Sequence, residues 1–293
     1  MNATLPAVAV CTKVPFELAE SPLWDEKRSL LWFVDITNHA IHSYDPLSGE
    51  LKHFQMPALV GSIGLTADNR IIAALKTGIH FFDPLTGEIE FLVNPEADRP
   101  GNQLNDGKVG PDGCFWVGSM DEHSTNISGA LYRITPSGQS IRVKDGIFVS
   151  NGLAWSPDGS TMYHTDGLTP TVKAFDFDIA SGSISNERDF ITLDYEEFGW
   201  PDGATVDAQG NYWSAGIFKG RINQISPQGE LLCSLQMPVI GTTMPCLGGT
   251  HGTTLFVTSL AADLDEERQE GTLLSFEVEV QGVHPYRFGE ATL

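Results

Sequence analysis

Four short segments of the chain place a carboxylate or an amide directly beside glycine, proline or serine. They are Ala19-Glu20-Ser21-Pro22, Asn105-Asp106-Gly107-Lys108, Ser150-Asn151-Gly152-Leu153 and Pro201-Asp202-Gly203-Ala204. If they met, Glu20, Asn105, Asn151 and Asp202 would supply two carboxylates and two amide oxygens, the oxygen-only donor set that hard cations prefer. No cysteine or histidine shares these positions, which argues against structural zinc. Taken singly, however, N-D-G and P-D-G are also ordinary turn sequences.

An internal repeat favours a shared site over four separate turns. A turn followed by an apolar or aromatic strand recurs six times, with its middle position at residues 25, 68, 112, 158, 209 and 251. A second segment alternates with the first and starts at residues 40, 78, 129, 171, 220 and 271. Each copy is a short alternating strand that ends in a Pro-, Asp- or Ser-rich turn and a glycine, a pattern typical of hairpins. The chain therefore carries a two-strand signature six times, and each copy leaves room for two more strands.

The repeat predicts an all-β fold, a six-bladed β-propeller with four antiparallel strands per blade. Six repeats averaging about 45 residues use some 270 of the 293 residues, so we predict that residues 1–293 form a single domain. The 30 glycines and 17 prolines disfavour long helices. An unrelated β-sandwich is the alternative, and the acidic segment 263–270 is expected to be a solvated loop.

Closing the repeats into a ring would bring the four polar segments together. Glu20 precedes the turn position of its repeat by 5 residues, and Asn105, Asn151 and Asp202 precede theirs by 7. Similar offsets in a cyclic fold place side chains at similar heights around one axis. The sequence therefore predicts one divalent cation at a mouth of the central channel, with Ca²⁺ favoured and Mg²⁺, Mn²⁺ or Zn²⁺ as alternatives.

The same segments resemble a known family. The phrases AESPLWD, NDGKVGPDGCFWVGSM, SNGLAWSPDG, PDGATVDAQGNYW and CLGG occur in order, and they are similar to those of the SMP-30/gluconolactonase/regucalcin-like (LRE) family of sugar lactonases. The resemblance runs from about Val14 to Phe288 and implies a six-bladed propeller, one divalent cation and hydrolysis of sugar lactones. Motif by motif, it implies that Glu20, Asn151 and Asp202 bind the metal and that Asn105 lies beside it, contacting substrate or bound water.

Two positions depart from that family's pattern where substrate is bound. The family often has Arg two residues before the Asn of N-D-G, where this chain has Gln103, and some members have Glu where this chain has His123. We predict Gln103, Asn105 and His123 as substrate contacts, with an exposed loop histidine as the alternative for His123. Amide side chains in place of Arg favour a neutral aldonolactone over an acidic one. The tryptophans fall mainly in repeat strands and are expected to pack between blades, but Trp200, beside Asp202, is a candidate for the pocket wall.

The predicted activity is that of a hydrolase acting on carboxylic esters, which opens an aldonolactone to its sugar acid. A cation would polarise the lactone carbonyl and stabilise the oxyanion. Asp202 is the predicted catalytic base that activates water, with a metal-bound hydroxide as the alternative nucleophile. The sequence contains no G-x-S-x-G elbow, P-loop or dinucleotide fingerprint. Two other hypotheses remain: a related metal-dependent esterase or phosphotriesterase, and a non-catalytic calcium-binding propeller.

Composition and charge limit the classes of partner that we expect this protein to bind. With 17 Lys and Arg against 38 Asp and Glu, the net charge is −21, so we expect no nucleic acid partner. No apolar stretch approaches the 18 residues of a spanning helix, and residues 1–20 lack the pattern of a secretory signal, so we expect no membrane partner. The scattered cysteines Cys11, Cys114, Cys233 and Cys246 are predicted to be reduced, buried thiols of a cytoplasmic protein. The expected partner is a small-molecule sugar lactone.

Overall fold

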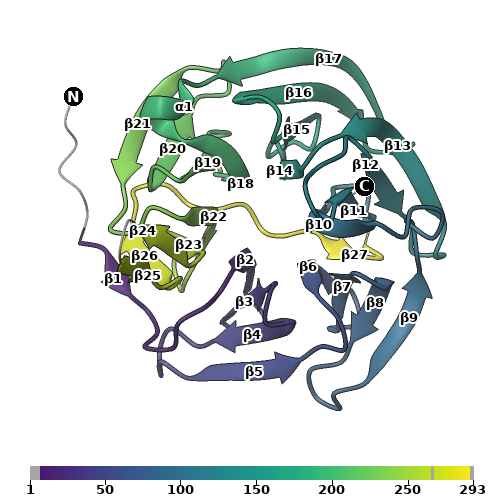
Figure 1. Cartoon of the computed structure of the whole chain (residues 1–293), viewed down its shortest axis with the longest axis horizontal. Helices are drawn as coiled ribbons and strands as arrows, with labels where there is room; N and C mark the ends of the chain where they lie inside the picture. The colour runs from purple at the N-terminus through teal and green to yellow at the C-terminus, as the bar shows by residue number, and fades with distance from the viewer. Residues whose placement is uncertain (1–6, 265–266, 291–293) are drawn as a thin grey trace.

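The computed structural model describes residues 7–264 and 267–290 and shows six β-sheets in a closed ring around a central channel (Figure 1). The prediction of a six-bladed β-propeller is confirmed. In blades one to five the four antiparallel strands follow the chain from the channel outward. The recurring segments of the sequence are the second and third strands of each blade.

The strands are grouped by blade as follows. Blade one contains β2 (Ala19–Asp25), β3 (Leu30–Asp35), β4 (Ala40–Tyr44) and β5 (Leu51–Gln55). Blade two contains β6 (Val60–Thr66), β7 (Ile71–Leu75), β8 (Gly78–Phe82) and β9 (Ile89–Val93), and blade three contains β10 (Asn102–Val109), β11 (Phe115–Asp121), β12 (Gly129–Ile134) and β13 (Ser140–Ile147). Blade four contains β14 (Ser150–Trp155), β15 (Thr161–Asp166), β16 (Thr171–Asp178) and β17 (Ser183–Thr192), and blade five contains β18 (Trp200–Val206), β19 (Tyr212–Ile217), β20 (Arg221–Ile225) and β21 (Leu231–Gln236). Blade six contains β22 (Thr242–Gly248), β23 (Thr254–Ser259), β26 (Leu273–Glu277) and β1 (Ala9–Val10).

The core lies between the blades. Each of the six boundaries between neighbouring blades holds one apolar cluster of buried side chains. In β3, Leu31 and Phe33 pack against blade six, whereas Trp32 and Val34 pack against blade two. Successive side chains of a strand point to opposite faces, so a strand between two neighbours must be apolar on both. This is why the second strands appear in the sequence as unbroken apolar runs.

Both ends of the chain help to close the ring. The N-terminal strand β1 pairs antiparallel with β26, so blade six takes its outermost strand from the start of the chain. At the other end, β27 (Arg287–Phe288) pairs parallel with β6 on the channel side of blade two, after the chain has crossed the centre of the ring (Figure 1). The sequence repeats do not predict either contact, because both join segments more than 200 residues apart.

The remaining elements are short. One helix, α1 (Tyr195–Phe198), precedes β18 and is held at its N-terminus by the Asp194 side chain. The expectation of a loop at 263–270 was wrong, because β24 (Ala262–Leu264) and β25 (Glu267–Gln269) form a hairpin there. Residues 265 and 266 lie outside the described residues.

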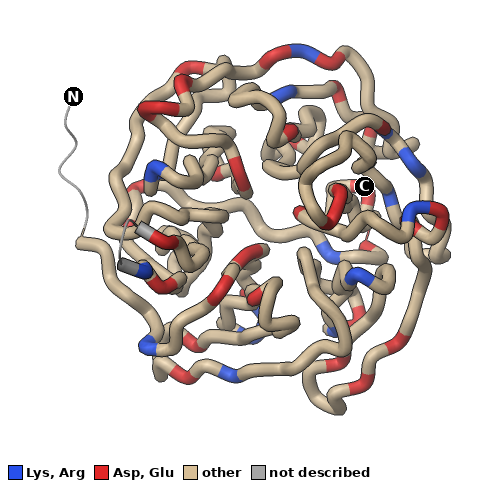
Figure 2. The backbone as a smooth tube through the Cα atoms, in the orientation of Figure 1, with Lys and Arg blue, Asp and Glu red and all other residues tan. Residues whose placement is uncertain are grey.

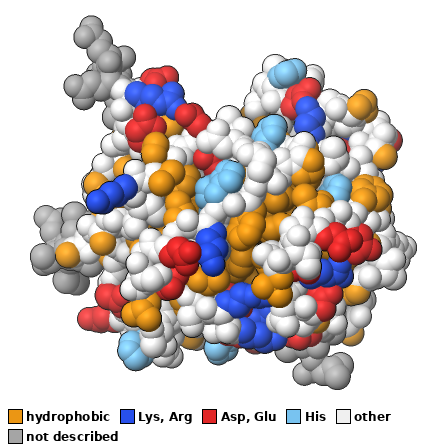
Figure 3. All heavy atoms as spheres, turned by 90° about the horizontal axis from the view of Figure 1, so that it is seen from below, with side chains coloured by type: hydrophobic (Ala, Val, Ile, Leu, Met, Phe, Trp, Pro, Cys, Tyr) orange, Lys and Arg blue, Asp and Glu red, His pale blue; other side chains and the backbone are white. Residues whose placement is uncertain are grey.

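Charged and sulfur-containing residues are distributed round the ring. Lys and Arg are scattered among more numerous Asp and Glu (Figure 2), and one side of the ring shows charged side chains of both signs interspersed with apolar ones (Figure 3). All four cysteines are free thiols, as predicted, but only Cys114 and Cys246 are buried. Cys11 and Cys233 are half-buried, so the expectation of burial was wrong for these two.

Within the described part of the chain, no helix has the length and apolar character needed to cross a membrane.

Candidate metal and active site

Bulges in the innermost strands turn polar side chains toward the channel mouth. The pairing register slips by one residue between Glu20 and Leu23 in β2, and at the equivalent place in β10, β14 and β18. A bulge interrupts the alternation of a strand and re-aims the side chains beside it. Within two of these bulges Ser21 and Gly152 adopt positive φ angles of 50° and 69°. The glycine is suited to this conformation, because it has no Cβ to clash.

The four bulges open onto one cavity of about 420 Å³ at a mouth of the channel. Glu20, Asn105, Asn151 and Asp202 all line it, each from a different blade. The structure therefore brings together the four residues that the sequence grouped by their offsets. Trp200 also lines the cavity, as expected from its position beside Asp202.

These side chains form a connected polar array. The Asn105 amide donates from Nδ2 to the Ser150 carbonyl at 2.9 Å and to Oδ1 of Asn151 at 3.1 Å. Nδ2 of Asn151 in turn donates to Oδ1 of Asp202 at 2.5 Å. Oε2 of Glu20 accepts a hydrogen bond from the backbone N–H of Ser21 at 2.5 Å. The array leaves Oδ2 of Asp202 and Oε1 of Glu20 without a hydrogen bond to the described residues.

The two carboxylates of the array are difficult to keep charged without a cation. Burial raises the pKa of Glu20 well above its usual range, and the nearby charges of Asp202 and Asp106 raise it further. Burial, followed by the charge of Asp106, does the same to the pKa of Asp202. Two desolvated carboxylates beside amide groups are a donor set that fits a hard divalent cation. No group of three or more His, Cys, Asp or Glu suited to a metal occurs among the described residues, so the site would use two carboxylates with amide oxygens.

Asp106 and Lys108 lie below this array, and the sequence analysis did not single them out. Oδ2 of Asp106 accepts from the Leu153 N–H at 2.9 Å, while its buried Oδ1 has no hydrogen-bond partner in the structure. Burial raises the pKa of Asp106 and lowers that of Lys108, and the attraction between the two charges opposes both shifts. The two residues alternate along β10, and this period of two on an innermost strand was the signal that could have identified them.

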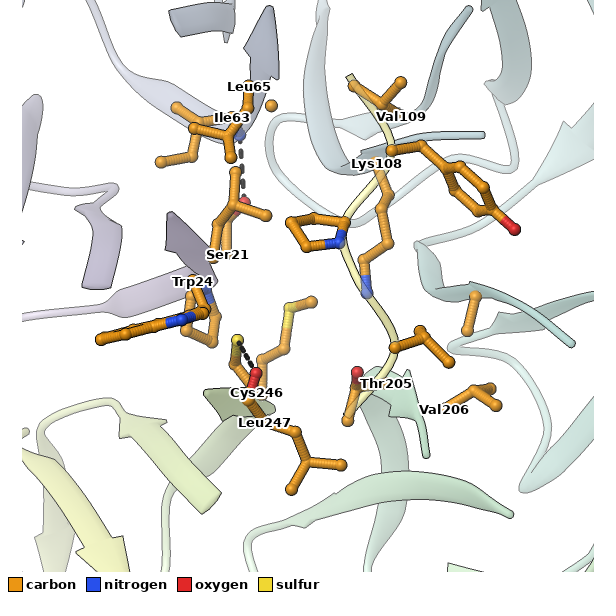
Figure 4. Close-up of a pocket in the computed structure, with 18 of the residues that line it drawn as sticks. Ser21, Trp24, Ile63, Leu65, Lys108, Val109, Thr205, Val206, Cys246 and Leu247 are labelled. Carbon is orange, nitrogen blue, oxygen red and sulfur yellow. Dashed lines mark hydrogen bonds between the residues drawn. The ribbon is translucent and has the colours of Figure 1, made fainter. Parts of the chain in front are cut away.

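The Lys108 side chain extends into a second cavity, near the middle of the ring (Figure 4). Its Nζ donates to the Ala204 carbonyl of β18 at 2.7 Å, so it spans from blade three to blade five. This cavity of about 80 Å³ surrounds it, lined also by Ser21, Thr205 and Cys246 (Figure 4). Burial raises the pKa of the Cys246 thiol to about 11, which keeps it protonated and makes it a poor nucleophile.

Two predicted substrate contacts lie outside the cavity wall. Gln103 is half-buried in β10 opposite Met120, and Met120 lines the cavity although Gln103 does not. His123 lies on an exposed loop with 77% of its side chain accessible and its Nε2 3.6 Å from Oε1 of Glu122. The neighbouring Ser124 lines the cavity instead. The assignment of Gln103 and His123 to substrate binding therefore stays a prediction, and the structure offers Ser124 and Met120 as the nearer side chains.

A sequence profile of the SMP-30/Gluconolactonase/LRE-like region matches residues 18–261, which include all four residues of the array. The chain belongs to the SMP-30/gluconolactonase/LRE-like family. Membership of this family supports sugar lactone hydrolysis in general.

Relatives and solved structures of this family match nearly the whole chain. Regucalcin from Danio rerio is 34% identical over 281 residues, covering 93% of this chain and 95% of the relative. The structure of a luciferin-regenerating enzyme has a TM-score of 0.90 and 30% identity, covering 96% of this chain and 99% of that one. A regucalcin structure from Agrobacterium tumefaciens, described as a calcium-binding protein, has a TM-score of 0.91, covering 97% of this chain and 98% of that one. At 24% identity, this last match shows a shared fold.

The raised pKa values of Glu20 and Asp202 would make the binding of a cation by these two carboxylates depend on pH. A carboxyl group with a higher pKa in the folded than in the unfolded chain makes folding less favourable as pH rises through that interval. A bound cation removes this loss, while at lower pH protons compete with it for the same oxygens. We therefore expect saturating Ca²⁺ to raise Tm more at about pH 7.5 than at about pH 5 in calorimetry.

The matched variant for this experiment is the double substitution Glu20→Gln and Asp202→Asn. It keeps the shapes of both side chains and removes both charges, so the Ca²⁺-dependent rise in Tm should be absent at either pH. A rise of equal size at both pH values in the unsubstituted protein would show that these two carboxylates do not bind the cation.

Proposed function

We propose that this protein is a metal-dependent lactonase, which hydrolyses a cyclic ester to the corresponding hydroxy acid. The observation that carries the proposal is the convergence of Glu20, Asn105, Asn151 and Asp202 from four blades on one cavity. Membership of a family that includes gluconolactonases supports the same reaction. The neutral aldonolactone predicted from the sequence is the reference substrate for testing it.

The free donor and acceptor atoms of the array indicate which residues would bind the cation, accept a proton or contact the substrate. Glu20 and Asp202 would hold the cation through carboxylate oxygens and Asn151 through its amide oxygen, consistent with the calcium-binding description of the Agrobacterium regucalcin. When bound, the cation supplies a Lewis acid that polarises the lactone carbonyl. Oδ1 of Asp202 is engaged by Asn151, which leaves Oδ2 to accept a proton from the attacking water. Both N–H bonds of the Asn105 amide are used within the array, so its Oδ1 is the atom available to a substrate hydroxyl or a water.

Removal of the cation should abolish the activity reversibly. After treatment with a chelator and gel filtration, hydrolysis of glucono-1,5-lactone is expected to fall to the uncatalysed rate, because nothing then polarises the carbonyl. Adding back Ca²⁺, Mg²⁺, Mn²⁺ or Zn²⁺ one at a time should restore it to different extents, measured by acid release with a pH indicator. Full activity in the chelated protein would contradict the proposal.

The same assay distinguishes the two competing hypotheses. Turnover of aryl esters or phosphotriesters in place of lactones would indicate the related esterase or phosphotriesterase. Tight cation binding with no turnover of any ester would indicate a non-catalytic calcium-binding propeller. The similarity to regucalcins, one of which is described as a calcium-binding protein, is the observation that favours this second hypothesis.

A further inference from the structure

The wall of the 420 Å³ cavity differs in character from its floor. The floor consists of the polar array and Asp106, whereas the wall above it is apolar. The apolar side chains include Leu18, Met120, Val149, Trp200, Phe218 and Leu260, contributed by blades one, three, four, five and six or by the segments that lead into them. Among the described residues that line the cavity, the Ser124 hydroxyl and the Trp200 indole N–H are the polar side-chain groups above the floor.

Two aromatic side chains of this wall are held in defined positions. The Trp200 ring stacks on Tyr195 of α1, with centroids 5.0 Å apart and an interplanar angle of 22°. Phe218 is 57% exposed and has a φ of 66°, a left-handed conformation that is unfavourable for a bulky side chain. Glycine or asparagine would occupy this position at lower cost. An exposed phenylalanine in a strained turn beside the cavity therefore suggests that its ring is used there.

A polyhydroxylated lactone would find few side-chain partners for its hydroxyl groups in the wall of this cavity. An aldonolactone with a six-membered ring carries four hydroxyl groups, and each needs a partner when it leaves water. The amide N–H groups of Asn105 are already used within the array, and one N–H of Asn151 is used by Asp202. In the wall, the Ser124 hydroxyl and the Trp200 indole N–H are the further side-chain partners. An apolar group of similar size would meet only hydrocarbon and aromatic surface, and its transfer from water is favourable.

We propose that the preferred substrate is a neutral lactone with an apolar substituent on its ring, and that this substituent packs against Phe218 and Trp200. The inference rests on the proposed lactonase function and specifies the substrate class of the same site. The ester carbonyl would lie at the polar floor beside Glu20 and Asp202, with the substituent directed to the mouth. The substituent is neutral because the apolar side chains of the wall would give a charged group no partner there.

The test compares δ-lactones that share a ring and differ in what the ring carries. kcat/KM, divided by the uncatalysed rate constant of each lactone, is measured for glucono-1,5-lactone, δ-valerolactone and δ-lactones with alkyl side chains of increasing length. The value should rise by about threefold to fourfold per added methylene until the cavity is full. The best alkyl lactone should exceed glucono-1,5-lactone by at least about tenfold.

A matched pair of variants locates the effect. Phe218→Asn removes the ring, and asparagine tolerates the positive φ. It should lower the ratio of kcat/KM for the alkyl lactone to that for glucono-1,5-lactone by about tenfold, mainly through KM. Phe91→Asn removes an equally exposed ring (58%, against 57% for Phe218) from the outer strand β9, away from the cavity, and should leave the ratio unchanged.

The outcomes separate this inference from the proposed function. Preference for glucono-1,5-lactone, or a ratio unaffected by Phe218→Asn, would overturn the inference and leave the lactonase intact. If the cation-loaded protein hydrolyses no lactone, the proposed function fails. Calorimetric binding of the matching alkyl δ-lactams then tests whether the cavity still takes a ring with an apolar substituent. Binding that tightens with chain length and weakens in Phe218→Asn would uphold the apolar site, and absence of binding would overturn it.

Discussion

Substitution of Asp202 by asparagine is expected to lower kcat/KM for lactone hydrolysis by about 10³-fold or more. The variant loses a negatively charged cation ligand and the Oδ2 atom assigned to accept a proton from water. Asparagine keeps the shape of the side chain, so the hydrogen-bonded neighbours need not move. The loss should appear in kcat as well as in KM, because both interactions strengthen in the transition state.

Two controls keep this result interpretable. Asp158→Asn changes the same Pro-Asp-Gly tripeptide in an exposed turn, where the carboxylate accepts from Ser156 and Ser160, and it should retain full activity. Because burial raises the pKa of Asp202, replacing it should not lower Tm of the cation-free protein at neutral pH, so inactivity cannot be ascribed to unfolding. A folded Asp202→Asn protein with more than about a tenth of the original activity would remove this residue from the mechanism.

Substitution of Arg287 by methionine is expected to lower the free energy of unfolding by about 3–5 kcal/mol. Arg287 is 4% exposed, and its Nη2 donates to Oδ1 of the fully buried Asp25 at 3.0 Å. The ion pair joins the last strand, β27, to blade one, while backbone pairing with β6 joins it to blade two. Burial alone would raise the pKa of Asp25, but hydrogen bonds from Arg28 and Arg287 lower it. Methionine would leave the buried carboxylate with Arg28 as its one remaining cation.

The measurement is chemical denaturation of the cation-loaded protein, with Arg188→Met as the matched substitution. Arg188 pairs with Asp176 at 2.8 Å, but both side chains are about half exposed, and such pairs contribute little to stability. Its unfolding midpoint should stay close to that of the unsubstituted protein. An equally small change for Arg287→Met would mean that the C-terminal segment is not needed to hold the ring closed.

The number of blades could be predicted from sequence because the signals for it are local. A run such as LLWFV at 30–34 is apolar at every position because β3 is buried between two blades, and a turn such as DPLTG at 83–87 needs only its own residues. Closure of the ring could not be predicted this way. The pairing of β1 with β26 and the Arg287–Asp25 ion pair join segments more than 250 residues apart, and the short strands β1 and β27 carry no repeat signal.

At the candidate site, too, some features could be predicted from neighbouring residues and others are visible only in the structure. The tripeptide Pro-Asp-Gly occurs at 111–113, 157–159 and 201–203. The sequence by itself distinguished Asp202 through its offset from the following turn. The structure shows what each carboxylate contacts: Asp112 accepts from Trp116 and Arg133, Asp158 from its own turn, and Asp202 from Asn151 at the cavity.

The sequence therefore determined the fold, the number of blades and the four polar residues of the array, because turn chemistry and strand alternation are written into neighbouring residues. Only the tertiary structure decided that Asp106 and Lys108 lie beneath the array and that Leu18, Phe218 and Leu260 form one apolar wall above it. These side chains come from separate blades and their loops, where no spacing rule applies. Their proximity arises from the closure of the ring, which brings distant segments to one mouth of the channel.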